Sequence, residues 1–298
     1  MITTIAFLGP AGTFTEAAVH KFAAHLPQVE TMPVGSPSEA VAAVRAGHAE
    51  YACVAIENSV DGAVTTTFDA LVEAEPVQIY REVDIPVAFS IMTRQGAGDI
   101  ARLSTHPVAF QQIRGWVKDN LPEAEFVPAS SNAAAAEAVA RGEADAAAAP
   151  ARAAELFGLE TIAQGVADVE GSATRFVLVG RPGKPTARTG QDRTSVIFTL
   201  PNEPGSLVGA LQDFAHRGVD LSRIESRPTR EAFGTYRFYV DLIGHIDDQP
   251  VAEALRALWL RAEDLLFLGS WPAATPAGKP PRDLAAADDW VARARRGQ

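Results

Sequence analysis

Polar residues that could bind an anion recur in five short segments, each at the expected end of a strand or start of a helix. The segments are GPAGTFTE (9–16), ENSVDG (57–62), STHP (104–107), ASSN (129–132) and TRF (174–176). In an α/β sheet such positions gather at the carboxyl edge, where helix N-termini present free backbone N–H groups that favour anions. One such segment alone is explained as a helix cap. Five in one region indicate a ligand site.

The last of these segments combines two chemical groups. In EGSATRFVLVG (170–180), the hydroxyl of Thr174 and the guanidinium of Arg175 stand at the start of an apolar strand that runs from Phe176 to Val179. A guanidinium offers a fixed two-pronged donor to a carboxylate. Judged from the residues alone, Thr174 could equally make a cross-strand hydroxyl contact, and Arg175 could form a surface ion pair.

Several other chemistries lack the residues they need. The six histidines are scattered without an H-x-x-x-H pair, and the single cysteine, Cys53, sits in an apolar run. We therefore expect no metal site, no disulfide and an inert thiol. The motifs G-x-S-x-G and G-x-G-x-x-G are absent, and Gly183-Lys184 lacks the spacing of a phosphate loop. No cofactor is expected. A net charge of -11 without a Lys/Arg stripe argues against nucleic-acid binding.

The N-terminal segment MITTIAFLGP has no basic region and is typical of a strand, not of a signal peptide. No apolar run approaches the roughly 18 residues of a membrane span. We therefore expect a cytoplasmic protein that does not bind a membrane.

The elements that must position these groups follow from two regimes of patterning. Residues 1–180 alternate short apolar runs with Ala-rich helical patterns, which indicates α/β units with helices between the strands. The expected strands are Ile5–Leu8, Val29–Val34, Tyr51–Ile56, Val77–Met92, Glu125–Val127, Ala144–Ala149 and Phe176–Val179.

Two stretches of this region resemble each other. SPSEAVAAVRAGHAEYAC (36–53) and SNAAAAEAVARGEADAAA (131–148) match at a constant offset of 95, which pairs Ser36 with Ser131 and Gly47 with Gly142. Each is typical of a capped helix, a glycine stop, an acidic turn and a strand. Alanine richness makes chance similarity easy, but a real duplication would give two similar lobes with a ligand cleft between them. We place these lobes at roughly residues 1–76 plus 160–180 and at residues 77–159.

The second regime follows a linker, RPGKPTARTGQDR (181–193), which is rich in Pro, Gly and basic residues. Residues 194–272 alternate strand and helix periodicities in the order β-α-β-β-α-β, the ferredoxin-like arrangement. Residues 273–298 form a tail rich in Pro and Ala, with a short helix near Trp290.

Together these motifs carry a family resemblance. FLGPAGTFTEAA, IENSVDGAVTTTFDAL, SNAAAAEAV, TRFVLVGR, PGSLVGAL and IESRP, in this order, resemble the bacterial monofunctional prephenate dehydratases over residues 4–272. The resemblance implies an α/β dehydratase domain (1–180) with two lobes like those of periplasmic binding proteins, and then an ACT regulatory domain (194–272). A fused form of the family begins with a helical chorismate mutase domain. Here a strand begins almost at Met1, so that activity is not expected.

The resemblance also implies a reaction and its residues. The reaction is the conversion of prephenate to phenylpyruvate, with loss of carbon dioxide and water, in phenylalanine synthesis. Thr174 matches the family's essential threonine, which protonates or hydrogen-bonds the departing hydroxyl, and Arg175 matches a substrate-binding position. The other implied substrate-binding residues are Glu57, Asn58, Ser59, Thr13, His106, Gln111, Ser131 and Phe176. Two of them have an alternative role, because Glu57 could cap a turn and His106 could make packing contacts only.

The sequence departs from the family pattern at two places. Gly171-Ser172 stands where Asn-Asn often precedes TRF, and THP stands where SHP is common. These changes affect the hydrogen bonds that support the site and do not exclude the activity.

In the ACT domain the resemblance implies a phenylalanine site between two subunits, with inhibition through a dimer or tetramer. A surface turn with solvated charges is the alternative. The implied effector residues are Asn202, Pro204, Gly205, Ser206, Leu207, Val208, Glu225, Ser226, Arg227 and Pro228.

Two other functions remain open. An arogenate dehydratase would differ only in accepting an amino group in place of the keto oxygen, and no motif distinguishes the two. A non-catalytic amino-acid sensor could also combine a two-lobed cleft with an ACT domain, although Thr174 and Arg175 together speak against it.

Overall fold

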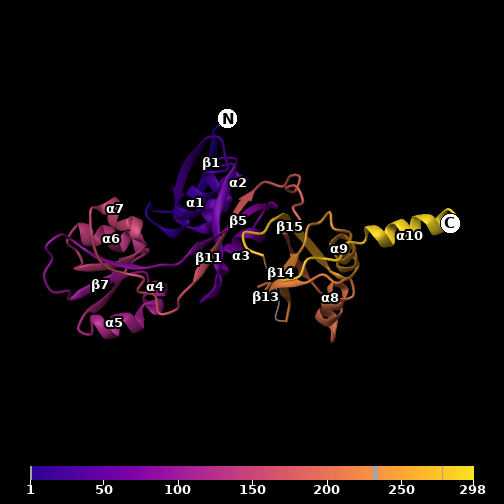
Figure 1. Cartoon of the computed structure of the whole chain (residues 1–298). Coiled ribbons are helices and arrows are strands. Elements are labelled where there is room, and N and C mark those ends of the chain that lie inside the picture. The colour runs from indigo at the N-terminus through magenta and orange to yellow at the C-terminus, as the bar shows by residue number, and fades with distance from the viewer. Residues whose placement is uncertain (1, 231–233, 277) are drawn as a thin grey trace. The chain divides into compact units, whose positions relative to one another are not determined.

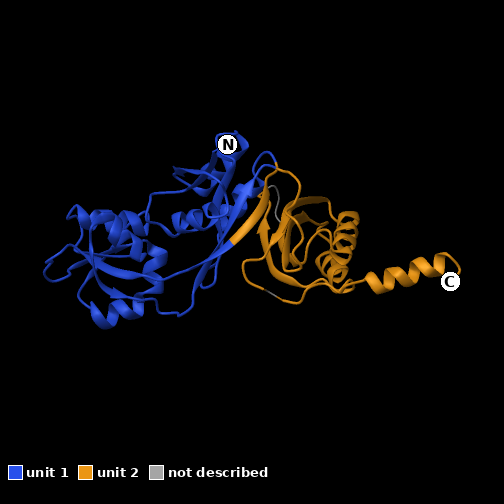
Figure 2. Ribbon diagram, turned by 45° about the horizontal axis from the view of Figure 1, so that its top comes forward, with its two compact units in different colours: residues 1–75, 83–181 blue, residues 76–82, 182–298 orange. Residues whose placement is uncertain are grey.

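The computed structural model describes residues 2–230, 234–276 and 278–298. Two compact units make up the chain, and Figure 2 colours them separately. The first unit contains residues 1–75 and 83–181, and the second contains residues 76–82 and 182–298. Within the described ranges no helix is both long and apolar enough to cross a membrane.

The first lobe, as we call the first sheet and its helices, has the strand order β2-β1-β3-β11-β5, with β4 paired to β3. Helix α1 packs Val19 and Phe22 against Phe176 and Leu178 of this sheet. Cys53 lies in the same core, where burial raises the pKa of its thiol. The elements of this lobe are β1 (Thr3–Leu8), α1 (Phe14–Ala23), β2 (Val29–Val34), α2 (Pro37–Arg45), β3 (Tyr51–Asn58), β4 (Gly62–Ala63), α3 (Thr65–Val72), β5 (Gln78–Pro86) and β11 (Ala173–Gly180) (Figure 1).

The second lobe is built on a sheet of order β10-β6-β9-β7-β8. Its four buried alanines in β9 leave room for the alanine-rich helix α6 to pack closely. The elements of this lobe are β6 (Ser90–Thr93), β7 (Arg102–Thr105), α4 (Pro107–Gln112), α5 (Arg114–Asn120), β8 (Glu125–Pro128), α6 (Asn132–Ala140), β9 (Ala146–Ala149), α7 (Ala151–Phe157) and β10 (Glu160–Gln164).

The predicted duplication is confirmed. Helix α6 begins and ends 95 residues after helix α2 does, which is the offset found in the sequence. The N-caps Ser36 and Ser131 both have a φ of -156°, with ψ values of 160° and 164°. The glycines that follow, Gly47 and Gly142, both have positive φ, at 75° and 81°. A positive φ is a conformation that glycine adopts without steric cost. The repeat therefore extends from the cap to the helix stop.

The two lobes exchange strands, so the expected lobe boundaries are wrong at two places. β5 was placed in the second lobe but lies in the first sheet beside β11, and β10 was placed in the first lobe but pairs with β6. The expected strand over 77–92 also divides into β5 and β6. Pro86, which has no backbone N–H to continue a ladder, is the last residue of β5.

The second unit has the predicted β-α-β-β-α-β order and a sheet of order β13-β14-β12-β15. Helices α8 and α9 cover one sheet face, where Phe198, Phe214 and Leu258 are buried. The ferredoxin-like prediction is confirmed, and the tail contains the expected helix. The elements are β12 (Asp192–Thr199), α8 (Ser206–Ala215), β13 (Leu221–Pro228), β14 (Tyr236–Ile243), α9 (Gln249–Arg261), β15 (Asp264–Pro272) and α10 (Ala285–Arg295).

Candidate active site

The last two residues of β3 and Ser59, which follows it, each contact one of the first three residues of β11. Ser59 Oγ accepts a hydrogen bond from Ala173 N at 3.0 Å. Asn58 Nδ2 donates to Thr174 Oγ1 at 2.9 Å. Glu57 Oε2 accepts from Arg175 at 3.3 Å. The antiparallel pairing of β3 with β11 produces this match, because Asn58 lies opposite Thr174 and Glu57 lies opposite Arg175. The ENS and TRF segments thus form one structure.

The orientation of the Asn58 amide is fixed by the turn that follows it. Asn58 Oδ1 accepts backbone N–H groups of Val60 at 2.8 Å and Asp61 at 3.0 Å. Its Nδ2 is therefore the atom that faces Thr174. A hydroxyl has one proton to donate and two lone pairs that accept. Because the Thr174 oxygen accepts from Asn58, its own O–H remains available to a bound molecule, and Thr174 is only 9% exposed.

Arg175 does not share a sheet face with Thr174, because neighbouring side chains on a strand point to opposite faces. Its Nε contacts Asp84 Oδ1 at 3.1 Å, and its Nη1 contacts Glu57 at 3.3 Å. The residue-level alternatives, a cross-strand contact for Thr174 and an ion pair for Arg175, are thus both present. Whether Thr174 and Arg175 both contact a bound substrate stays a prediction.

Three of the predicted residues line one cavity of about 200 Å³ between the lobes. Thr13 caps α1, His106 caps α4 and Ser131 caps α6, so three helices begin at this cavity. Its lining residues are Leu8, Gly9, Thr13, Phe14, Thr15, His106, Ser130, Ser131 and Asn132. Backbone N–H groups in the first turn of a helix have no partner within the helix, which favours an anion there.

The helix starts differ in how far the protein neutralises them. In α1, Glu16 lies in the first turn and accepts from Gly12 N at 2.7 Å. In α6 the first turn contains no acidic residue, and Ser131 Oγ accepts from Ala134 N at 3.0 Å. An anion in the cavity therefore meets an uncompensated helix dipole at α6.

His106 enters this cavity as a neutral donor. Its Nδ1 accepts the backbone N–H of Val108 at 3.2 Å, so the ring proton of the neutral form lies on Nε2. Burial lowers the pKa of His106 below its ordinary value, which favours this neutral form at pH 7. His106 therefore makes hydrogen bonds as well as packing contacts. Asn132 Oδ1 accepts from His106 N at 3.2 Å.

The predicted residue Gln111 and its neighbour Gln112 differ in burial. Gln111 is exposed, whereas Gln112 is 6% exposed and donates from Nε2 to Asp61 Oδ2 at 2.5 Å. Phe176, expected at the substrate, lies in the core of the first lobe with Phe14 against it. The expectations did not include Gln112 or Asp84, and they included Asp61 and Asn132 only as members of the ENSVDG and ASSN segments. A period-two count along β5 could have marked Asp84 as facing away from Val83 and Ile85.

Ser172, which stands before TRF where the family often has asparagine, makes two hydrogen bonds to Val87. Ser172 is 4% exposed, its Oγ donates to Val87 O at 3.3 Å, and its carbonyl accepts from Val87 N at 2.8 Å. The start of β11 is therefore supported without the Asn-Asn pair. Among the described residues no group of three or more His, Cys, Asp or Glu side chains could hold a metal ion.

Comparison with known proteins assigns the chain. Residues 5–184 match the family model described as prephenate dehydratase, and residues 194–260 match the model described as ACT domain. The chain belongs to the prephenate dehydratase family.

Three similar proteins illustrate the match. A prephenate dehydratase of Corynebacterium glutamicum is 56% identical over 307 aligned residues, which cover 99% of this chain and 98% of that protein. The crystal structure of a prephenate dehydratase from Arthrobacter aurescens in complex with L-Phe is 42% identical, with a TM-score of 0.89, covering 99% of this chain and 100% of that one. GqqA, named as a novel type of quorum quenching acylase, is 33% identical with a TM-score of 0.80, covering 91% and 98%.

In this family member, the expected effector residues of the ACT domain lie at one edge of its sheet. Thr199 of β12 and Arg227 of β13 both lie opposite Arg237 of β14. The loop from β12 to α8 therefore starts beside the end of β13. A Cβ added at Gly234 would stand 2.7 Å from Asn202 Nδ2, so this loop reaches the hairpin after β13. Gly205 precedes α8 with a φ of 86°.

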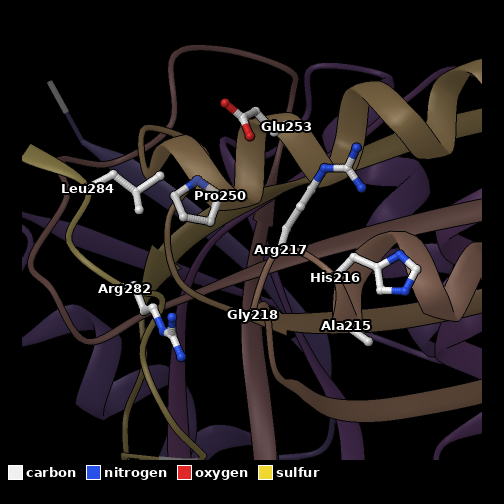
Figure 3. Close-up of a pocket in the computed structure, with 8 residues that line it drawn as sticks. All are labelled: Ala215, His216, Arg217, Gly218, Pro250, Glu253, Arg282 and Leu284. Atoms are coloured by element: carbon white, nitrogen blue, oxygen red, sulfur yellow. The ribbon is translucent and has the colours of Figure 1, made fainter. Parts of the chain in front are cut away.

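A separate cavity of about 380 Å³ lies at the other end of α8. Ala215, His216 and Gly218 line it together with Pro250 of α9 and Leu284 of the tail (Figure 3). None of the expected effector residues contributes to it.

Proposed function

We propose that the chain catalyses the decarboxylating dehydration of prephenate to phenylpyruvate, the carbon–oxygen lyase step of phenylalanine synthesis. The observation that carries this proposal is the Asn58–Thr174 hydrogen bond, which leaves the Thr174 proton available at a nearly buried position. Family membership supports the same reaction.

In the proposed reaction the ring carboxylate leaves as carbon dioxide. The electrons of its carbon–carbon bond complete the aromatic ring, and the bond from the ring to the 4-hydroxyl oxygen breaks. That oxygen takes a proton and leaves as water. Thr174 supplies the proton or a hydrogen bond to the developing charge. Because threonine is a weak acid, its contribution depends on its fixed position and on the Asn58 donor that stabilises negative charge on its oxygen.

The substrate carries two carboxylates, and the lobe cavity supports binding one of them. The open start of α6, with Ser131 and Asn132, provides positive partial charge. The Nε2 proton of neutral His106 provides a further donor. Thr13 contributes its cap hydroxyl at α1.

Direct substrate binding by Arg175 stays a prediction. Its guanidinium already meets Glu57 and Asp84, so a substrate carboxylate would have to replace one of these. Direct contacts from Glu57, Asn58, Ser59, Gln111 and Phe176 stay predictions as well. The contacts that Glu57, Asn58 and Ser59 make with β11 support a role in holding Thr174 in place.

We also propose that L-phenylalanine binds at the edge of the ACT sheet formed by the α8 start and the end of β13, and inhibits the reaction. The start of α8 suits the carboxylate of the amino acid and Glu225 suits its ammonium group. This site is proposed to lie between ACT domains of a dimer or tetramer, in the cytoplasm. The complex of the Arthrobacter aurescens protein with L-Phe supports the choice of effector.

The test is phenylpyruvate formation from prephenate by the wild type and by Asn58→Asp. The substitution keeps Oδ1 for Val60 N and Asp61 N but turns the donor to Thr174 into an acceptor that captures the threonine proton. We expect kcat to fall by about 100-fold, within the range of general acid catalysis. Asn120→Asp, in exposed α5 where Asn120 donates to Trp116 O, is the matched control and should keep the wild-type rate.

A wild type that forms no phenylpyruvate would refute the proposed reaction. If Asn58→Asp kept full activity, the role given to the Thr174 proton would be wrong. Turnover of arogenate under the same conditions distinguishes the arogenate dehydratase alternative. Phenylalanine binding without turnover of either substrate would identify a sensor.

A further inference from the structure

A series of buried ion pairs crosses the ACT sheet on the face opposite its helices. Arg223 of β13 makes two hydrogen bonds to Asp241 of β14, both at 2.8 Å. Arg193 of β12 lies 4.0 Å from Asp241 and 3.0 Å from Glu82 of β5. The side chains of all four residues are at most 5% exposed. Charges alternate in sign along the series.

Glu82 is the end of this series and is held by three groups of the same unit. Besides Arg193, it accepts from Trp271 Nε1 at 2.9 Å and from Ala274 N at 2.8 Å. Trp271 lies directly opposite Arg193 across the β12–β15 pair, so both reach Glu82 from one sheet face. The approach is close: a Cβ at Gly269 would stand 2.3 Å from Ile79 O. The first half of β5 is therefore fixed against the ACT sheet.

Glu82 and Arg223, the two ends of the series, each lie two residues before a residue with a proposed role in the site or in regulation. On β5, Asp84 follows Glu82 by two residues and holds Arg175 Nε at 3.1 Å. On β13, Glu225 of the proposed effector site follows Arg223 by two residues. Residues two apart on a strand point to the same face. A strand that moves at one of these residues moves its neighbour with it.

Buried charges tolerate small displacements poorly, because separating one pair leaves each ion without its partner in a medium of low dielectric constant. The members of the series therefore shift together or exchange partners as a set. Such a set has a few discrete arrangements, which is what transmission between distant sites requires.

We propose that the ion pairs Arg223–Asp241–Arg193–Glu82 couple the effector strand β13, through β5 and Asp84, to Arg175 beside the catalytic threonine. This regulatory role rests on the proposed function, since it presumes the reaction and its inhibition by phenylalanine. Effector binding at Glu225 displaces β13, the pairs carry that displacement to Glu82, and β5 changes the hold of Asp84 on Arg175. Glu82 and Trp271 act as positioning residues in this coupling.

The test compares Trp271→Phe, Glu82→Gln and the wild type in two measurements. The first is the phenylalanine concentration that halves the rate of phenylpyruvate formation. The second is the phenylalanine dissociation constant by calorimetry. We expect both variants to bind phenylalanine within about 3-fold of the wild type and to keep the uninhibited rate, whereas the half-inhibiting concentration rises by at least 10-fold, a typical size for an allosteric coupling. Trp290→Phe, at an exposed tryptophan in α10, is the matched control.

Trp271→Phe keeps all four charges and removes only one donor to Glu82, so it decides the question if Glu82→Gln fails to fold. Unchanged half-inhibition in Trp271→Phe would overturn the coupling while leaving the reaction intact. Parallel loss of phenylalanine binding and inhibition would also overturn it, because the residues would then serve the effector site itself. An inactive wild type would instead refute the proposed function, and an active wild type that phenylalanine does not inhibit would refute the coupling.

Discussion

The two lobes share a scaffold but differ in charge at the start of equivalent helices. Ser36 and Ser131 cap α2 and α6 in the same conformation. In α2, Glu39 accepts from Gly35 N at 2.9 Å and closes the helix start. The equivalent position in α6, 95 residues later, is Ala134, and that helix start lines the cavity. Of these two equivalent helices, the one with the acidic residue in its first turn does not line the cavity, and the one without it does.

The exchanged strands show the same contrast. β11 lies antiparallel beside β3 and β6 lies antiparallel beside β9, with Gly180 opposite Tyr51 and Thr93 opposite Ala146. This register makes Phe176 equivalent to Phe89. The β3–β11 register then shifts between Phe176 and Arg175, so Thr174 and Arg175 correspond to Val87 and Ala88 by position in the sequence only. The duplication therefore supplies two similar frames, and only one carries the hydroxyl and the guanidinium.

Making the first lobe resemble the second should have the largest effect. Thr174→Val keeps the shape of the side chain and removes the proton, as at Val87, and we expect kcat to fall by 100-fold or more. The reciprocal change Val87→Thr should leave kcat within about 2-fold, although burying a hydroxyl there lowers the unfolding free energy by about 1–3 kcal/mol. Steady-state assays with prephenate and urea unfolding measure both. Equal losses of kcat in the two variants would remove the proposed asymmetry between lobes.

Closing the open helix should have an intermediate effect. Ala134→Glu gives α6 the acidic residue that α2 has, and its carboxylate would occupy the N–H groups that face the cavity. We expect KM for prephenate to rise by about 10-fold, with kcat changed much less. Glu39→Ala in α2 should leave KM unchanged. If the rise in KM were the same for both variants, or absent from both, the α6 start would not be part of the substrate site.

Much of the fold could be predicted because local signals agreed with it. The capping residues and glycine stops marked α2 and α6, and the alternation in Tyr236–Ile243 marked a strand of the ACT sheet. The two-residue strand β4 was missed, and so were the strands β7 and β10. Their sequences, RLST and ETIAQ, are short and largely polar at the ends, and β7 is placed by parallel pairing with distant strands. The sheet exchange of β5 and β10 also depends on such distant pairing.

The candidate site could be predicted as a set of segments but not as a geometry. The ENS and TRF motifs identified the candidate residues. The pairing of Asn58 with Thr174 could not be predicted from them, because it depends on the antiparallel register of β3 and β11. The contact of Asp84 with Arg175 was not predicted, because these two residues lie 91 positions apart in the sequence. The contact between Gln112 and Asp61 was not predicted for the same reason, because these residues lie 51 positions apart in the sequence.

The acidic turn after each repeated helix should give the smallest effect. Asp145 accepts from Arg102 N at 2.8 Å, and its hydrogen bond to the Arg102 side chain lowers the pKa of Asp145. In the first lobe, Glu50 accepts from Thr4 N, and Thr4 has no guanidinium. A lowered folded-state pKa stabilises the protein above the ordinary pKa of about 4 and loses this effect on acidification.

Asp145→Asn should therefore lower the unfolding free energy at pH 7 by less than about 1 kcal/mol, because the pair is partly exposed to solvent. Its difference from the wild type should shrink as the pH falls below about 4, and high salt should reduce it at pH 7. Glu50→Gln should show no comparable sensitivity to salt. Urea unfolding of both variants at two pH values and two salt concentrations measures these differences. A loss in Asp145→Asn that is independent of pH and salt would assign it to the backbone hydrogen bonds of the turn instead of to the charge of Arg102, and the two lobes would then be alike at this position.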